Sequence, residues 1–110
     1  MNTQVMAAIT ELIEFMDARA EEHFGEHYPT LDPVTHSNDG GRKYIRIAQQ
    51  DECGARHVHC FVDTRTGGVY KAAGWKAPAL NGERFNLLDQ KSFAELKQVW
   101  DPHGAYLYKK

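Results

Sequence analysis

The stretch RHVHCFVDTRTGGVYKAA, residues 56–73, shows most directly how this chain folds. Polar and apolar side chains alternate over residues 56–63, which is the period of a β-strand. The Asp-Thr-Arg-Thr-Gly-Gly run at 63–68 is typical of a hairpin turn, and residues 69–73 supply the returning strand. A second alternating run at 42–49 precedes this hairpin, and the turn-forming residues 50–55 separate the two. The pattern predicts antiparallel hairpins.

Helical periodicity appears on both sides of the strands. Residues 3–24 carry apolar side chains at helical spacing, with Thr3 as the expected N-cap and Gly25 beyond the end. Residues 25–41 show no period and are interpreted as a linker. A short helix is expected after Asp89 or Ser92, followed by a break at 101–104 and a possible closing strand at 105–108.

These elements predict an α+β fold in a single domain over residues 1–110. A long N-terminal helix packs on a small antiparallel β-sheet, with a short C-terminal helix and a closing strand. The sheet and a ligand loop are expected to occupy residues 42–110.

Strand alternation predicts two unequal faces of the sheet. The face expected to pack on the helix carries Ile45, Ile47, Val58, Cys60 and Val62. The opposite face carries Tyr44, Arg46, His57, His59 and Phe61. Aromatic side chains mixed with cations indicate a ligand or subunit contact. The alternative is that these are scattered surface aromatics, which strands favour in any case.

Composition excludes some classes of function. The chain has 110 residues and a formal charge of −2, which argues against a binder of extended nucleic acid but is compatible with a small anionic ligand. We find neither an apolar run long enough for a membrane span nor a leader pattern, and we expect a cytoplasmic protein. Cys53 and Cys60 are expected to be free thiols.

Cys53, His57, His59 and Cys60 lie close together in the sequence, and these residue types can bind zinc. Alternation points Cys60 away from the two histidines, and no recognised ligand spacing is present, so we expect no metal and no cofactor. The serines and cysteines also lack any motif of nucleophilic catalysis. We therefore expect a protein that is not an enzyme.

The loop at 74–86 is unusual for a chain reversal because it contains Trp75, Lys76, Arg84, Phe85 and Asn86. An aromatic platform beside cationic and amide donors is suited to a planar ligand that bears phosphate. The alternative is that Trp75 and Phe85 form a hydrophobic plug into the core.

Several segments resemble a widespread family of small phage-encoded proteins: residues 43–47, 58–63 and 66–79, the last containing Tyr-Lys-x-x-x-Trp-Lys-Ala-Pro-Ala. Residues 84–89 resemble that family's Arg-Gly-Asn block with Phe85 in place of the glycine, and residues 104–107 fit as well. The layout and this block are also similar to the first Thoeris anti-defence family. Its phage proteins sequester cyclic ADP-ribose isomers that bacterial TIR-domain enzymes make.

This second resemblance implies a phage counter-defence protein that acts as a sponge in the cytoplasm of an infected bacterial cell. The expected ligand is a cyclic ADP-ribose isomer or a cyclic oligonucleotide, held without cleavage by a dimer or larger homo-oligomer. The resemblance implies that Trp75 stacks on the base, that Asn86 supplies a polar amide, and that Arg46 or Arg84 lies near the pyrophosphate. Lys76 and Phe85 complete the predicted ligand-binding set.

A different class of function stays open. The chain could be a small protein-binding module that inhibits a host factor. Its interface would then be the face that carries Tyr44, His59 and Phe61.

Overall fold

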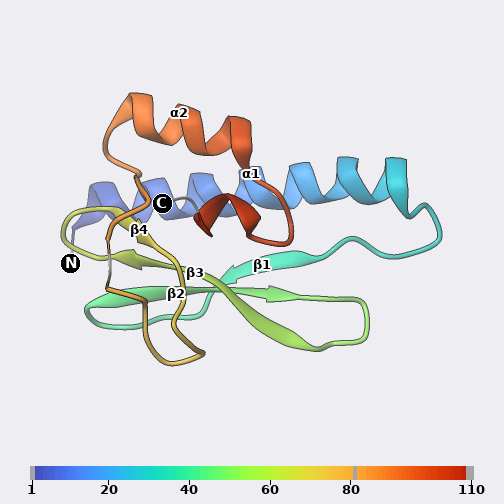
Figure 1. Ribbon diagram of the computed structural model, residues 1–110, viewed down its shortest axis with the longest axis horizontal. Helices are drawn as coiled ribbons and strands as arrows, with labels where there is room; N and C mark the ends of the chain where they lie inside the picture. The colour runs from blue at the N-terminus through green and yellow to red at the C-terminus, as the bar shows by residue number, and fades with distance from the viewer. Residues whose placement is uncertain (1, 81, 109–110) are drawn as a thin grey trace.

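The structure is a computed structural model that describes residues 2–80 and 82–108. Its elements, in chain order, are α1 (Thr3–His27), β1 (Thr35–Asn38), β2 (Tyr44–Gln50), β3 (Arg56–Asp63), β4 (Gly68–Tyr70), β5 (Phe85–Asn86), α2 (Gln90–Val99) and the 3-10 helix η1 (Ala105–Tyr108). The strands form one antiparallel sheet in the order β1-β2-β3-β4-β5, so each pairs with the next along the chain. Both α-helices lie on one side of this sheet (Figure 1). The predicted α+β class is confirmed.

Helix α1 supplies one half of the core. Its buried stripe consists of Val5, Ile9, Leu12, Met16 and Ala20, as the helical spacing predicted. It faces a set of sheet side chains that includes Ile45, Ile47, Cys60, Val62 and Val69.

Both ends of α1 differ slightly from the prediction. The N-cap is Asn2 rather than Thr3, because the Asn2 Oδ1 accepts hydrogen bonds from the backbone N–H groups of Gln4 and Val5. The helix also continues past Gly25 to His27, and the Tyr28 N–H donates to the Phe24 carbonyl at 2.8 Å. The rings of Phe24 and Tyr28 pack at 5.5 Å between centroids, which stabilises the extra turn.

The interpretation of residues 25–41 as a linker is wrong in part, because β1 lies within it. Thr35 pairs with Gln50, and Asn38 pairs with Ile47. Only His36 of the four β1 residues is buried, so the strand carries no hydrophobic alternation to reveal it. Polar side chains of this kind are usual on an edge strand.

A β-bulge between β2 and β3 corrects the predicted faces. Ile47 lies opposite Cys60 but Ala48 lies opposite Val58, which leaves His59 as the extra residue. Val58 therefore shares the outer face with Ala48, and His57 lies opposite Gln49. His59 turns inward and keeps only 8% of its surface exposed.

The ring of the bulge residue His59 contacts the side chains of Trp100, Tyr106 and Gln49. Its Nε2 accepts from the Trp100 indole N–H at 3.1 Å and contacts the Tyr106 hydroxyl at 2.7 Å. Because indole is only a donor, Nε2 carries a lone pair and the proton resides on Nδ1, which donates to Gln49 Oε1 at 3.0 Å. His59 is therefore a neutral imidazole with its proton on Nδ1.

The same Gln49 oxygen extends the network to α1. It lies 3.1 Å from His36 Nε2, while His36 Nδ1 lies 2.9 Å from Asp17 Oδ1. His36 therefore lies between the Asp17 carboxylate and the Gln49 amide. The network thus connects α1, β1, β2 and β3 through side chains.

The chain after α2 does not form the predicted closing strand. Asp89 caps α2, in agreement with the sequence, but Ala105–Tyr108 forms a 3-10 turn. The Asp101 carboxylate accepts from the backbone N–H groups of His103 and Tyr106, and Gly104 adopts a φ of 77°. These local bonds curl the segment so that Tyr106 and Leu107 are buried.

The returning strand is also shorter than predicted, since β4 ends at Tyr70 rather than Ala73. Beyond Tyr70 the chain leaves the sheet and forms a loop on the side opposite α1 (Figure 1).

Acid should destabilise the fold through His59. Burial, and next the charge of His36, lower the pKa of His59 to about 3. Between that pKa and the ordinary value of about 6.5 the unfolded chain binds the extra proton, so the free energy of unfolding falls with falling pH. We expect a contribution of up to about 1.4 kcal/mol per pH unit.

Urea denaturation between pH 7 and pH 4 measures this contribution. The His59→Gln variant should lose that part of the pH dependence, while His57→Gln, at an exposed position, should keep it. Identical slopes in the wild type and His59→Gln would contradict the assignment.

Candidate ligand-binding cleft

The loop after β4 folds back over the outer face of the sheet. Ala72 bridges Pro78, and the Ala79 N–H donates to the Lys71 carbonyl at 2.7 Å. This closure places Trp75 and Lys76 near the tip of the loop. Beneath it Phe61, directly opposite Arg46 in the sheet, keeps only 2% of its surface exposed. The loop therefore covers part of the outer face and forms one wall of a cleft.

Arg46 connects the loop to the sheet. Its Nε donates to the Trp75 carbonyl at 2.7 Å, and its guanidinium carbon lies 4.5 Å from the centroid of the indole ring. Trp75 itself is 38% exposed. The indole is therefore a surface platform stabilised by a cation–π contact, rather than a plug into the core.

Asp39 fixes two guanidinium groups beside that platform. One carboxylate oxygen accepts from Arg46 and the other from Arg56, each at 2.7 Å. Arg56 also lies 5.4 Å from the Trp75 ring. The hydrogen bonds from Arg56 and then Arg46 lower the pKa of Asp39, which keeps the carboxylate ionised. The cluster of two arginines and one aspartate keeps an excess positive charge.

A cleft of about 280 Å³ opens next to this cluster. Trp75 does not line it but contacts Arg46, which does, and we call it the Trp75 cleft. Its cationic side chains are Arg42, Lys43, Arg46 and Lys76. Tyr44 adds aromatic surface, the buried Phe61 lies at the base of the cleft, and residues 39–41 add backbone. This concentration of positive charge, on a chain whose formal charge is −2, suits a small anionic ligand with a planar group.

The wall formed by residues 39–44 depends on a glycine. The turn closes through hydrogen bonds from the Asp39 N–H to the Arg46 carbonyl and from the Arg46 N–H to the Gly40 carbonyl. Gly41 adopts a φ of 137°, and an added Cβ would overlap the Tyr44 carbonyl oxygen. The turn thus presents Arg42 and Lys43 in one defined backbone conformation.

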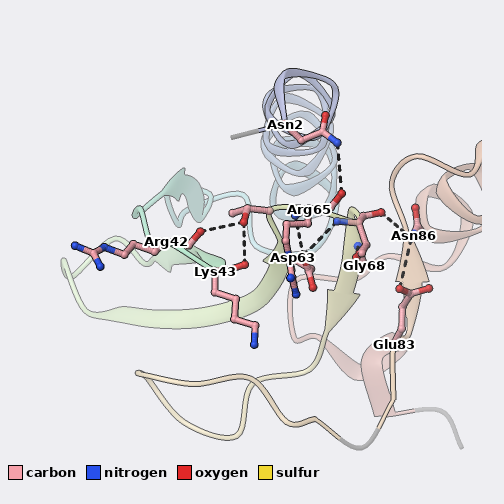
Figure 2. A network of polar contacts seen from close by, with 10 residues as sticks. Asn2, Arg42, Lys43, Asp63, Arg65, Gly68, Glu83 and Asn86 are labelled. Carbon is pink, nitrogen blue, oxygen red and sulfur yellow. Dashed lines mark hydrogen bonds and ion pairs between the residues drawn. The ribbon is translucent and has the colours of Figure 1, made fainter.

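Asn86 does not lie in this cleft but supports the turn between β3 and β4. Its Nδ2 donates to the Thr66 carbonyl at 3.0 Å and to Glu83 at 3.4 Å, and its Oδ1 accepts from the Leu88 N–H at 2.8 Å. Asp63 caps the same turn from inside by accepting from the N–H groups of Arg65 and Thr66. Figure 2 shows Asn86 on one side of the turn and Arg42 and Lys43 on the other.

Arg84 and Phe85 also make structural contacts within the fold. Arg84 Nε donates to the Leu107 carbonyl at 2.7 Å, and its Nη1 donates to the Gly82 carbonyl at 3.0 Å. Phe85 is 2% exposed and packs 5.9 Å from the Tyr106 ring. The plug interpretation therefore describes Phe85, whose ring packs beside Tyr106 and not in the cationic cleft.

The predicted ligand-binding set thus divides in two. The structure brings Trp75, Arg46 and Lys76 together, and it places Asn86, Arg84 and Phe85 in contacts that hold β5 and the C-terminal segment. Sequence reasoning missed Asp39, Arg42, Lys43 and Arg56. The signal that could have found the first three is an aspartate and two basic residues flanking the Gly40-Gly41 pair.

The histidines and cysteines do not gather into a site. Within residues 2–80 and 82–108, no group of three His, Cys, Asp or Glu side chains is placed to hold a metal ion. Because of the bulge, His59 and Cys60 both point inward, contrary to the predicted alternation. Burial raises the pKa of the Cys60 thiol to about 12, so this thiol stays protonated and unreactive. No helix in the described part of the chain is long and apolar enough to span a membrane.

The fold and the cleft define a small α+β domain whose sheet is covered by helices on one face and carries a cationic cleft on the other. The chain belongs to DUF7717, a family of unknown function whose profile matches residues 1–109. No curated protein and no solved structure shows significant similarity to it. The geometry of the cleft is therefore the basis for a proposal about function.

Removal of the Asn86 side chain should weaken the fold. The Asn86→Ala variant loses the bonds to Thr66, Glu83 and Leu88, and we expect the free energy of unfolding to fall by about 1–3 kcal/mol. Urea denaturation measures the loss. Gln98→Ala removes an exposed amide from α2 and should change stability by less than about 0.5 kcal/mol. Equal stability of the two variants would contradict the structural role of Asn86.

Proposed function

We propose that this protein binds a nucleotide-derived immune signal in the cleft beside Trp75 and sequesters it without cleaving it. The ligand class is a cyclic ADP-ribose isomer or a cyclic oligonucleotide. The observation that carries the proposal is the arrangement of Arg46, Asp39 and Arg56 around an exposed indole, next to a cleft with further cations. The phage counter-defence role follows from the resemblance of the layout and of residues 84–89 to the Thoeris anti-defence family.

The chemistry of such a ligand matches the cleft. It combines a purine base with a pyrophosphate, and these groups require an aromatic surface and cationic donors. Within the described residues, Arg46 uses two of its five N–H donors, one in the bond to the Trp75 carbonyl and one in the bond to Asp39. Three N–H donors are left for phosphate oxygens. Each charge-assisted hydrogen bond contributes about 1.5–3 kcal/mol, and base stacking on an aromatic ring contributes about 1–3 kcal/mol. A few such contacts are enough for tight binding.

The same groups favour binding over catalysis. An arginine side chain stays protonated at any physiological pH, so it supplies fixed charge rather than a proton-transfer group. The Asp39 carboxylate is held by two guanidinium groups and its pKa is lowered, which makes it a weak general base near neutral pH.

The proposal includes a homo-oligomer, a dimer or larger, in the cytoplasm of an infected bacterial cell. Both points come from the resemblance. A second subunit over the cleft would enclose the ligand. Light scattering with and without ligand measures the assembly.

Two of the three residues that were expected to form an interface with a host protein are buried. Phe61 is 2% exposed and His59 is 8% exposed, so the prediction that they form a surface with Tyr44 is wrong. The structure therefore favours the small-ligand proposal over that binding module.

Isothermal titration with ADP-ribose isomers and cyclic dinucleotides tests the proposal. We expect tight binding of at least one isomer, and chromatography after heat release should recover it intact. Arg46→Met and Trp75→Ala should each weaken binding about 100-fold, which corresponds to about 2.7 kcal/mol. Arg19→Met removes a half-exposed arginine from α1 and should leave the affinity unchanged.

Two results would contradict this function. The absence of heat with every nucleotide would remove the ligand class. Recovery of a cleaved product at substoichiometric protein would make the protein an enzyme.

A further inference from the structure

A second cavity lies at the edge of β3, away from the Trp75 cleft. Among the described residues β4 pairs with β3 only at Phe61 and Val62, and the chain turns away after Tyr70. In the described part of the chain, β3 from Arg56 to Cys60 therefore has β2 on one side and no strand on the other. An open strand edge of this kind presents backbone donors and acceptors to a new strand.

The space beside this edge is a cavity of about 310 Å³. Val58 and His59 of β3 line one side, Lys71 and Ala72 line a second, and residues 102–104 together with Leu107 and Tyr108 complete it. The His59 ring is fixed by Trp100, Tyr106 and Gln49, so this wall is rigid before any ligand enters. Such preorganisation lowers the entropic cost of binding.

The cavity carries basic groups. Lys71, His57 and His103 line it, and none of the described residues that line it is an aspartate or a glutamate. The Lys71 Nζ lies 4.5 Å from the centroid of the exposed Tyr108 ring, at the mouth. Gln49 adds a neutral donor, because its amide oxygen contacts the two histidines and, among the bonds of residues 2–80 and 82–108, its NH₂ group is left for a ligand.

We propose that this cavity binds the C-terminal end of an extended peptide. The peptide backbone adds to the edge of β3 beside residues 56–60, and its terminal carboxylate lies by Lys71 and His103. A simple anion would interact with the cationic side chains but not with the strand edge. The end of a peptide can pair its backbone with the strand edge and its carboxylate with the cations. This site is separate from the Trp75 cleft and goes beyond the proposed nucleotide binding.

Fluorescence polarisation with a labelled hexapeptide of alternating threonine and valine tests the proposal. We expect the free acid to bind at least tenfold more tightly than the C-terminal amide. The same peptide N-methylated at alternate residues should lose binding, because it can no longer pair with a strand edge. In NMR spectra the free acid should shift the backbone amides of residues 57–60.

Variants of the intact protein separate the two contributions. Lys71→Met should bring the affinity for the free acid close to that for the amide, and it should not change the affinity for the amide. Lys91→Met, an exposed lysine at the start of α2, is the matched control and should behave as wild type. Nucleotide binding should be unaffected in Lys71→Met, so failure of this site is distinguishable from failure of the Trp75 cleft.

Three results would overturn the proposal. The first is equal binding of the acid and the amide, and the second is no binding at millimolar peptide. The third is that acetate alone reproduces the NMR shifts of the peptide, which would show an anion site without strand addition.

Discussion

The bulge that inserts His59 into β3 is the constraint on which most of this structure depends. It turns one polar ring inward at a point where alternation would have placed it outside. That ring then accepts from Trp100 and contacts Tyr106, which brings the chain after α2 against the sheet. The C-terminal segment in turn forms one side of the cavity at the β3 edge. A buried polar group of this kind stabilises one arrangement, because any other leaves it without partners.

Electrostatics organise the opposite face. Asp39 is the one carboxylate among the described residues that line the cleft, and its role is to hold Arg46 and Arg56 rather than to react. Without it, the two guanidinium groups would repel each other beside the same indole. Asp39 holds both guanidinium groups beside Trp75 before a ligand arrives. The two arginine side chains then need little rearrangement when the ligand binds.

The sequence predicted those helices and strands whose apolar side chains repeat at a regular spacing, but not the elements without such a pattern. The α1 stripe and the β3 strand follow from spacing alone, whereas β1 buries only His36 and gives no pattern. Residues 105–108 were expected to form a strand, but the bonds from Asp101 curl the segment into a 3-10 turn. In the site, the loop composition groups Trp75 with Lys76, the family resemblance adds Arg46, and the structure brings the three together. Asn86 follows Phe85 directly in the sequence, yet β5 buries the Phe85 ring and commits Asn86 to the neighbouring turn, because strand neighbours point to opposite faces. Arg56 could not be found, since its contact with Asp39 depends on the β1–β2–β3 register.

NMR titration with a cyclic ADP-ribose isomer tests the central claim most directly. The side chains of Arg46 and Trp75 each carry an N–H group whose signal reports contact with a ligand. The account predicts shifts of the Arg46 Nε–H and the Trp75 indole N–H, together with the amides of residues 39–44. The Trp100 indole N–H, bonded to His59, should not move and serves as an internal control. Shifts centred on Asn86 and the turn at 63–68, or no shifts at all, would contradict the account.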